Sequence, residues 1–248
     1  MSKNNIYITY LYNSGFIAET EKHLMIFDFC LGVSDVNTIN ATVLKSKPYV
    51  TVFVSHAHRD HFNPMILRWR VRRPDIQYIF SDDIPELDNV IRMRSGEAIE
   101  INNMNIIALP STDIGVSFLV TVDGFVIYHA GDLNYWNWQQ ENNSIEEYQI
   151  RQRKAKIAFQ RALYPLRKEE IDVAFFPVDP QIGSNYDEGA IYFINNFSPK
   201  VFVPMHFRRE YAVCEKFRRK KSSPKKPCCA PRTRSILCRK VRRSARSW

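Results

Sequence analysis

No uninterrupted apolar run in this sequence approaches the roughly 20 residues that a helix needs to cross a bilayer. The first ten residues also lack the basic start, the long apolar stretch and the small-residue cleavage site of a secretory signal. We therefore expect a cytoplasmic protein that has no membrane partner.

A cysteine framework is also missing. The five cysteines form no CxxC pair, they show no regular spacing, and their number is odd. This pattern disfavours a disulfide scaffold, and free thiols in a reducing compartment are the simpler interpretation. The hydrophobic fraction of 45% is ordinary for a globular protein, so a chain of 248 residues can bury a sizeable core in one large domain or two small ones.

Acidic residues are absent from the last part of the chain. Thirteen of the 35 Lys and Arg residues lie between Arg218 and Trp248, where there is no Asp or Glu, so residues 1–217 hold 22 basic and 26 acidic residues. The body is therefore mildly acidic and the basicity belongs to the tail. We predict a folded domain over 1–217 and a disordered tail over 218–248. The tail is either a genuine basic arm, which could bind nucleic acid non-specifically, or the product of a frame shift near Arg218.

The order of apolar segments predicts an α/β (α+β) fold with two sheets packed face to face and helices outside. Helices are expected from about Pro64, over Ile145–Leu163 with a capping box at Ser144, and near Glu188–Asn195. Strands are expected at Ile6–Tyr10, Phe16–Glu19, Leu24–Phe27, Tyr49–Val54, Gln77–Phe80, Asn105–Leu109, Val116–Val122, Phe125–His129, Val173–Phe176 and Val201–Pro204.

The sharpest chemical signal follows the buried strand at Tyr49–Val54. Four ligand-type side chains, His56, His58, Asp60 and His61, lie within six residues. Because side chains alternate in direction along the loop, His56 and His58 can point one way. Asp60 and His61 then reach a second position, so one loop can serve two neighbouring metals. A chance polar run in a surface loop is the alternative, but histidines seldom cluster in this way without a metal or catalytic role.

Two later strand ends supply further candidates. After the strand that ends at His129, small residues let the backbone approach a ligand, and the carboxylate of Asp132 can bridge two cations. A turn aspartate is the commoner meaning of Gly-Asp alone, and His129 itself is better interpreted as a supporting or core residue. His206 follows the last strand and can supply one more neutral ligand.

The order HxHxDH, then HAGD at a strand end, then PMH at a strand end resembles the metallo-β-lactamase superfamily. Within it, the sequence looks similar to the L-ascorbate-6-phosphate lactonase-like and phospholipase D-like hydrolases. The resemblance covers about residues 6–217 and implies a four-layer αββα sandwich with the metals at one edge between the sheets. It implies that His56 and His58 bind the first metal. It also implies Asp60 and His61 on the second metal, with Asp132 as the bridge and His206 completing the second site.

One departure concerns the first metal. Many members of the superfamily have a further histidine between the first motif and the bridging aspartate, whereas residues 110–115 contain none. Asp113 in this stretch either serves the first metal, directly or through a hydrogen bond to His56 or His58, or only makes a turn. A carboxylate ligand there would shift the metal preference from zinc towards manganese or iron.

Other candidates are less specific. Asp28 ends an early strand and either hydrogen-bonds a ligand or makes a turn. Trp136 lies in an aromatic segment that either lines a substrate pocket or packs against the domain. Asp179 follows a strand at the same edge and is a supporting acid or a substrate contact. Arg59 either meets an anionic substrate or faces water.

These residues predict a metal-dependent hydrolase. Two cations that share a water lower its pKa towards neutrality, and Asp60 or Asp132 can orient the nucleophile. The expected reaction is hydrolysis of an ester, lactone, amide or phosphodiester of a small molecule, with two zinc ions, or manganese or iron. A nuclease is the alternative enzyme, although the acidic body argues against a nucleic-acid track. A catalytically silent metal-binding scaffold and a nucleic-acid binder acting through the tail are the alternatives of another class. The sequence leaves the oligomeric state open.

Overall fold

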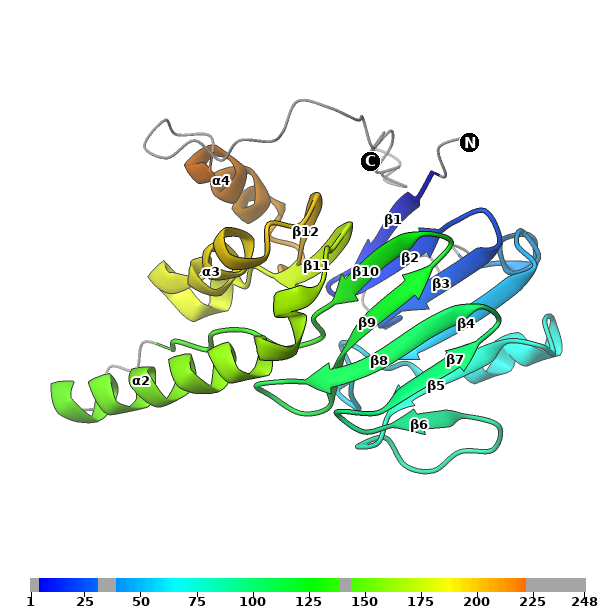
Figure 1. The fold of residues 1–248 in the computed structure, drawn as a ribbon, viewed down its shortest axis with the longest axis horizontal. Coiled ribbons are helices and arrows are strands. Elements are labelled where there is room, and N and C mark those ends of the chain that lie inside the picture. The colour runs from blue at the N-terminus through cyan, green and yellow to red at the C-terminus, as the bar shows by residue number, and fades with distance from the viewer. Residues whose placement is uncertain (1–4, 31–38, 139–143, 222–248) are drawn as a thin grey trace.

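The computed structural model describes residues 5–30, 39–138 and 144–221. Two six-stranded sheets pack face to face with helices outside them, as the sequence predicts (Figure 1). The first sheet has the order β1 (Tyr7–Tyr12), β2 (Gly15–Glu19), β3 (His23–Phe27), β4 (Tyr49–Val54), β5 (Gln77–Ser81) and β6 (Ile91–Met93). The second has the order β12 (Val201–Met205), β11 (Val173–Pro177), β10 (Phe125–His129), β9 (Val116–Val122), β8 (Met104–Pro110) and β7 (Ala98–Ile101).

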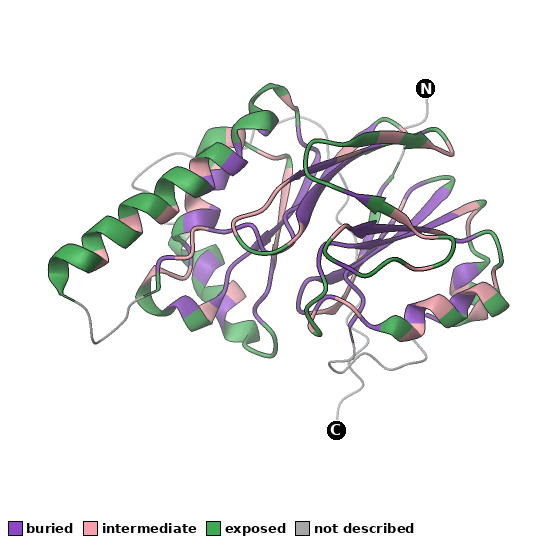
Figure 2. Cartoon of the chain, turned by 90° about the horizontal axis from the view of Figure 1, so that it is seen from below, coloured by how far each residue is buried: buried purple, intermediate pink, exposed green. Residues whose placement is uncertain are grey.

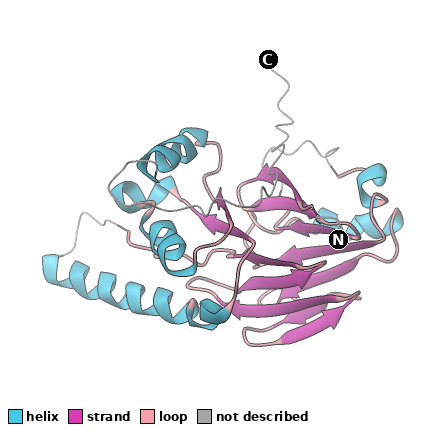
Figure 3. Ribbon diagram, turned by 45° about the horizontal axis from the view of Figure 1, so that its top comes forward, coloured by secondary structure: helices cyan, strands magenta, loops and turns pink. Residues whose placement is uncertain are grey.

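The helical segments lie on the outer faces of both sheets (Figure 3). The α-helices are α1 (Ala41–Leu44), α2 (Ile145–Ala162), α3 (Glu188–Phe197) and α4 (Tyr211–Lys221). The 3₁₀ segments are η1 (Pro64–Val71), η2 (Tyr164–Lys168) and η3 (Pro180–Asn185). Within the described ranges, no helix combines the length and the apolar character that a membrane span needs.

Alternation along the strands explains the layers, because neighbouring side chains of a strand point to opposite faces. Val52 of β4 belongs to an apolar cluster with Ile66 and Trp69 of η1, on the outer face of the first sheet. The next residue, Phe53, lies instead in the cluster between the sheets, where its ring is 5.3 Å from that of Phe118 in β9. The central strands are accordingly buried and the outer helix faces are exposed (Figure 2).

Aromatic contacts attach the helices to the second sheet. Phe193 of α3 stacks on Phe176 of β11, with ring centroids 4.6 Å apart. Phe217 of α4 lies 5.6 Å from Phe202 of β12. Each aromatic side chain buries a large apolar area, so these contacts fix the helices against the sheet.

Parallel strands bring the chemistry-bearing loops to one edge. β3 is parallel to β4, and β10, β11 and β12 are parallel to one another, so the loops after them leave the same edge of each sheet. Each set of loops also contacts the opposite sheet or one of its turns. The amide of Val116 donates to the carbonyl of Ser55 at 3.0 Å, and the amide of His206 donates to the carbonyl of Asn13 at 3.2 Å.

Several local expectations can be compared with the structure. The capping box is present, since the Ser144 hydroxyl accepts from the Glu147 amide and the Glu147 carboxylate accepts from the Ser144 amide. Asn63 caps the predicted helix from Pro64, which is a 3₁₀ helix. Helix α4 crosses the predicted domain boundary after residue 217 and continues to Lys221. Residues 222–248 lie outside the described residues, so the rest of the tail prediction stays a prediction.

Candidate metal centre

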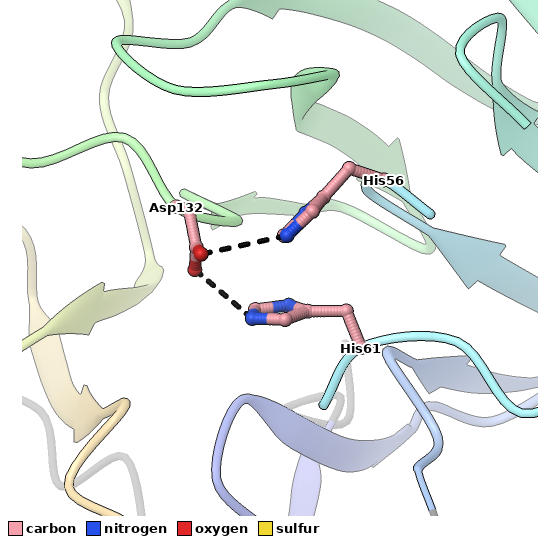
Figure 4. A group of neighbouring side chains, drawn as sticks. All are labelled: His56, His61 and Asp132. Atoms are coloured by element: carbon pink, nitrogen blue, oxygen red, sulfur yellow. Dashed lines mark ion pairs between the residues drawn. The ribbon is translucent and has the colours of Figure 1, made fainter. Parts of the chain in front are cut away.

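Side chains from three loops converge between the sheets. His56 and His61, from the loop after β4, face Asp132, from the loop after β10 (Figure 4). The Nε2 atom of His56 lies 3.4 Å from Asp132 Oδ2, and Nε2 of His61 lies 3.0 Å from Asp132 Oδ1. His206, after β12, brings its Nε2 atom to 3.3 Å from the same Oδ1 atom. Asp60 completes the group, with Oδ2 3.6 Å from His206 Nε2 and 3.8 Å from His61 Nε2.

The converging atoms form three overlapping sets, and the ligand atoms of each set lie within 4.8 Å of one another. The sets are His56, His61 and Asp132; Asp60, His61 and His206; and His58, Asp113 and Asp132. The structure therefore brings together all seven residues that the sequence predicts as metal ligands. Asp132 belongs to two of the sets, which is the position that a bridging carboxylate needs.

Four of the converging atoms are buried and lack a hydrogen-bond partner among the described residues. They are His56 Nε2, His61 Nε2, His206 Nε2 and Asp132 Oδ1. A buried polar atom without a partner costs about 1–3 kcal/mol, so four such atoms at one point require an explanation. Bound cations would satisfy all four atoms at once. Imidazole nitrogens and carboxylate oxygens without sulfur fit zinc, manganese or iron.

Carboxylates behind the imidazoles hold each ring in one orientation. Nδ1 of His61 donates to Asp28 Oδ2 at 2.8 Å, and Nδ1 of His206 donates to Asp179 Oδ2 at 3.0 Å. Nδ1 of His56 lies 3.0 Å from the hydroxyl of Ser55, which itself donates to Asp28 Oδ2 at 2.7 Å. The proton on each Nδ1 atom leaves the lone pair of Nε2 facing the centre, which is the tautomer that a metal ligand needs.

Asp28 and Asp179 thus act through the histidines. Asp28 is buried, and its second oxygen accepts from the amide of Ser55 at 2.7 Å. Asp179 is also buried, and its second oxygen accepts from the amide of Gln181 at 2.9 Å. Both oxygens of Asp179 are therefore engaged behind His206, which favours the supporting role over a substrate contact.

The surrounding imidazoles favour the ionised form of the carboxylates in the centre. Burial alone would raise the pKa of Asp132, but His61 and His206 outweigh it and hold that pKa well below its usual range. The nearby imidazole of His206 is the main cause of a lowered pKa at Asp60. Burial lowers the pKa of His206, but Asp132, Asp179 and Asp60 outweigh this and raise it to about 9.

Two glycines allow the loops to approach one another. A Cβ atom at Gly131 would lie 2.8 Å from the Cβ of Ser55, and one at Gly115 would lie 2.1 Å from the Ser55 carbonyl oxygen. Both glycines have positive φ angles, of 54° and 77°. His129, just before the Asp132 loop, is fully buried and donates from Nε2 to the carbonyl of Ser14 at 2.9 Å. It supports this loop from the core.

Other residues surround the mouth of the centre. Trp136 donates from its indole nitrogen to the carbonyl of Asp132 at 3.0 Å, and its ring lies 6.0 Å from that of His206. It also stacks on the exposed Trp138. Arg59 is exposed. Sequence reasoning missed Arg208, whose guanidinium approaches Asp60, and Ser55, whose place just before the first motif was the only available signal.

No protein-family model matches this chain, and none of the curated proteins matches it. Solved structures do. A protein described as a metal-dependent hydrolase from Parabacteroides distasonis superposes with a TM-score of 0.61 and 18% identity, over 89% of this chain and 94% of that one. Igni18, a metallo hydrolase from Ignicoccus hospitalis, gives a TM-score of 0.59 and 19% identity, over 87% of this chain and 91% of that one.

The metallo-β-lactamase fold protein YhfI from Bacillus subtilis gives a TM-score of 0.56 at 11% identity, over 87% of this chain and 90% of that one. The chain therefore has the metallo-β-lactamase fold that the sequence resemblance implies. At these identities the likeness shows the fold alone, and it does not distinguish the lactonase-like group from other members.

Proposed function

We propose that this protein is a hydrolase that uses two divalent metal ions at the centre described above. The observation that carries the proposal is the convergence of four buried, unpartnered ligand atoms from three loops. Structural packing does not explain such a cluster, because each atom loses its water and gains no hydrogen bond in return. The fold shared with metallo-hydrolases supports the same interpretation.

The ligands divide between two positions. Asp60, His61 and His206 are assigned to one position, since their ligand atoms form a compact set. The other position takes His56 and His58, as in the sequence-based assignment. Asp132 lies between the two positions, with Oδ2 towards His56 and Oδ1 towards His61 and His206. This placement is the geometric reason for assigning it as the bridge.

Bound cations would lower the pKa of a shared water and polarise the oxygen atom that gains charge during hydrolysis. The side chains supply the rest. Asp60 has a half-exposed carboxylate at the mouth, where Asn13 donates to its Oδ2 atom at 3.1 Å, so it can accept the proton of the attacking water. Asp132 is buried and orients the nucleophile. The Asp28 and Asp179 carboxylates keep the imidazoles from turning.

The proposed substrate is a small molecule with an ester, lactone, amide or phosphodiester bond. The stacked pair Trp136 and Trp138 supplies an aromatic wall beside His206 that can contact its apolar part. Zinc, manganese and iron are all compatible with the nitrogen and oxygen ligands.

Metal analysis followed by an activity panel tests this proposal. We expect about two metal equivalents per chain and hydrolysis of at least one of the four bond types. The variants His61→Ala and Asp132→Ala should lose metal and activity together. Asp82→Asn, which removes an exposed carboxylate paired with Arg94, is the matched control and should retain both. A double variant of His61 and Asp132 that hydrolysed its substrate at the wild-type rate would contradict the proposal.

A further inference from the structure

The loop of residues 111–115, between β8 and β9, is fastened to both of the loops that carry metal ligands. The hydroxyl of Thr112 donates to the carbonyl of Asn134 at 2.7 Å and accepts from its amide at 3.0 Å. Asn134 is two residues after Asp132. At the other end of the loop, Gly115 packs so closely on Ser55 that no side chain would fit. Asp113 is therefore held between the two ligand loops.

The carboxylate of Asp113 does not build the turn in which it lies. The amide of Asp113 donates to the hydroxyl of Ser111 at 3.2 Å, so Ser111 makes the side-chain contact of this turn. For the described part of the chain, the structure shows no hydrogen bond or ion pair at the Asp113 carboxylate itself. This geometry argues against the interpretation of Asp113 as a plain turn residue.

The same carboxylate lies within 4.8 Å of ligand atoms of His58 and Asp132. Two donors at 2.0–2.2 Å from one ion lie at most about 4.4 Å apart, so small side-chain movements would place all three on a single cation. The unpartnered, buried Nε2 atom of His56, which lies 3.4 Å from Asp132 Oδ2, is an independent sign that this side of the centre takes a cation.

We infer that Asp113 is a direct ligand of the metal position that His58 and Asp132 serve, and that its carboxylate makes this position more favourable to manganese or iron relative to zinc. The inference rests on the metal centre of the proposed function. Two carboxylates at one position provide hard oxygen donors and two negative charges, where an imidazole would provide a softer, neutral nitrogen. Zinc binds most nitrogen and oxygen sites more tightly than manganese, so the expected effect of Asp113 is on the ratio of the Zn²⁺ affinity to the Mn²⁺ affinity.

Metal titration of the full-length protein, stripped of metal and then supplied with Mn²⁺ or Zn²⁺ alone, tests this inference. We expect the isosteric variant Asp113→Asn to weaken Mn²⁺ binding at one position at least tenfold, with loss of the corresponding electron paramagnetic resonance signal of bound Mn²⁺. The variant Asp113→His should bind at both positions, but with its ratio of Zn²⁺ to Mn²⁺ affinity raised at least tenfold over that of the wild type.

Asp83→Asn is the matched control. Asp83 accepts from the amide of Ala57 in the same histidine loop at 2.8 Å, but it belongs to none of the three converging sets. The Asp83→Asn variant removes an equal charge near the centre and should leave the affinities for Zn²⁺ and Mn²⁺ within about twofold of the wild type. Asp113 is exposed, so both of its variants are expected to fold, and circular dichroism spectra check this.

The outcomes separate this inference from the proposed function. Unchanged stoichiometry and affinity in Asp113→Asn would overturn the inference and leave the hydrolase intact. An unchanged affinity ratio in Asp113→His would do the same. A wild-type protein that took up neither metal would overturn both. Because the readout is metal binding, the result does not depend on finding the substrate.

Discussion

The guanidinium of Arg208 lies 3.8 Å from the carboxylate of Asp60, and the two side chains are 46% and 36% exposed. The hydroxyl of Tyr10 donates to the carbonyl of Arg208, whose φ angle is 52°. An exposed ion pair at this distance contributes little to stability, so stability does not explain why this arginine stands at the mouth. An arginine whose carboxylate partner is also a proposed metal ligand is suited to bind an anionic group of a substrate.

We therefore expect Arg208→Gln to raise the KM of anionic substrates about tenfold, because a hydrogen bond to a charged group contributes about 1.5–3 kcal/mol. The KM of neutral esters and the metal content should stay unchanged. Steady-state kinetics on a matched pair of neutral and anionic esters measures the difference, and Arg59→Gln serves as the control. Equal losses for both esters would rule out anion recognition by Arg208.

Removal of the metals should destabilise the fold. Without cations, His56, His61 and His206 leave buried nitrogen atoms unpartnered beside ionised carboxylates. Binding at a free metal concentration of 100 times Kd stabilises a protein by about 2.7 kcal/mol per site. A chelator should therefore lower the Tm by roughly 5–10 °C for each site that it empties in a domain of this size. Calorimetry with and without added metal measures the shift, and an identical Tm in both would count against a metal site.

The variant Asp28→Asn should weaken metal binding through two histidines at once. Asp28 accepts from His61 directly and from Ser55, which contacts His56. Loss of such a supporting acid typically reduces metal affinity about 10–100-fold. Ser55→Ala removes only the branch to His56, so we expect a smaller loss. Isothermal titration of both variants compares the branches. If Ser55→Ala were the weaker binder of the two, the direct bond from His61 would not be the main support.

The pair of Lys220 and Asp187 should connect α4 to the stability of the domain. Nζ of Lys220 donates to both oxygens of the buried Asp187, at 2.8 and 3.0 Å. Lys220→Met should cost about 1–2 kcal/mol, because Lys220 itself is half-exposed and solvent reduces the loss. A chain ending at residue 217 should lose at least as much, whereas one ending at 221 should keep the wild-type Tm. Equal Tm values for the two truncated chains would contradict this role.

The contribution of the same ion pair to stability should depend on pH in the alkaline range. The hydrogen bond to Asp187 is the main cause that raises the pKa of Lys220 above 10.5. A raised lysine pKa contributes stability that is fully present below the value in the unfolded chain and disappears as the pH rises through the folded value. The difference between wild type and Lys220→Met should therefore shrink only above about pH 10.5, as denaturant titrations at several pH values would show.

Local patterns made the central strands and the first metal loop predictable. The β-branched run of β4 can be buried on both faces, and the histidines follow it directly. The order of the three motifs also predicted six of the seven candidate ligands that the structure brings together. The edge strands β6 and β7 were not predicted, because they are short and mostly only partly buried, so their apolar pattern is weak. Helix α4 was hidden by its many basic residues.

Contacts between loops could not be predicted in the same way. Asp28 and Ser55 are 27 residues apart and meet only because β3 and β4 are parallel neighbours. Arg208 reaches Asp60 because the loop after β12 turns back over the centre, and no spacing in the sequence reports that turn. Whether Asp113 makes a turn or faces a metal likewise depends on the contacts of Ser111 and Thr112.

The position of Trp136 gives the protein an optical probe of its own centre. Its indole hydrogen-bonds to the Asp132 carbonyl and meets the ring of His206 edge-on, while Trp69 lies in the outer apolar layer behind the first sheet. The fluorescence of Trp136 should therefore change when metal binds at the centre, whereas the fluorescence of Trp69 should not. Manganese or iron, with unpaired electrons, should quench that emission more strongly than zinc. The identity of the bound ion can then be followed in solution without a label.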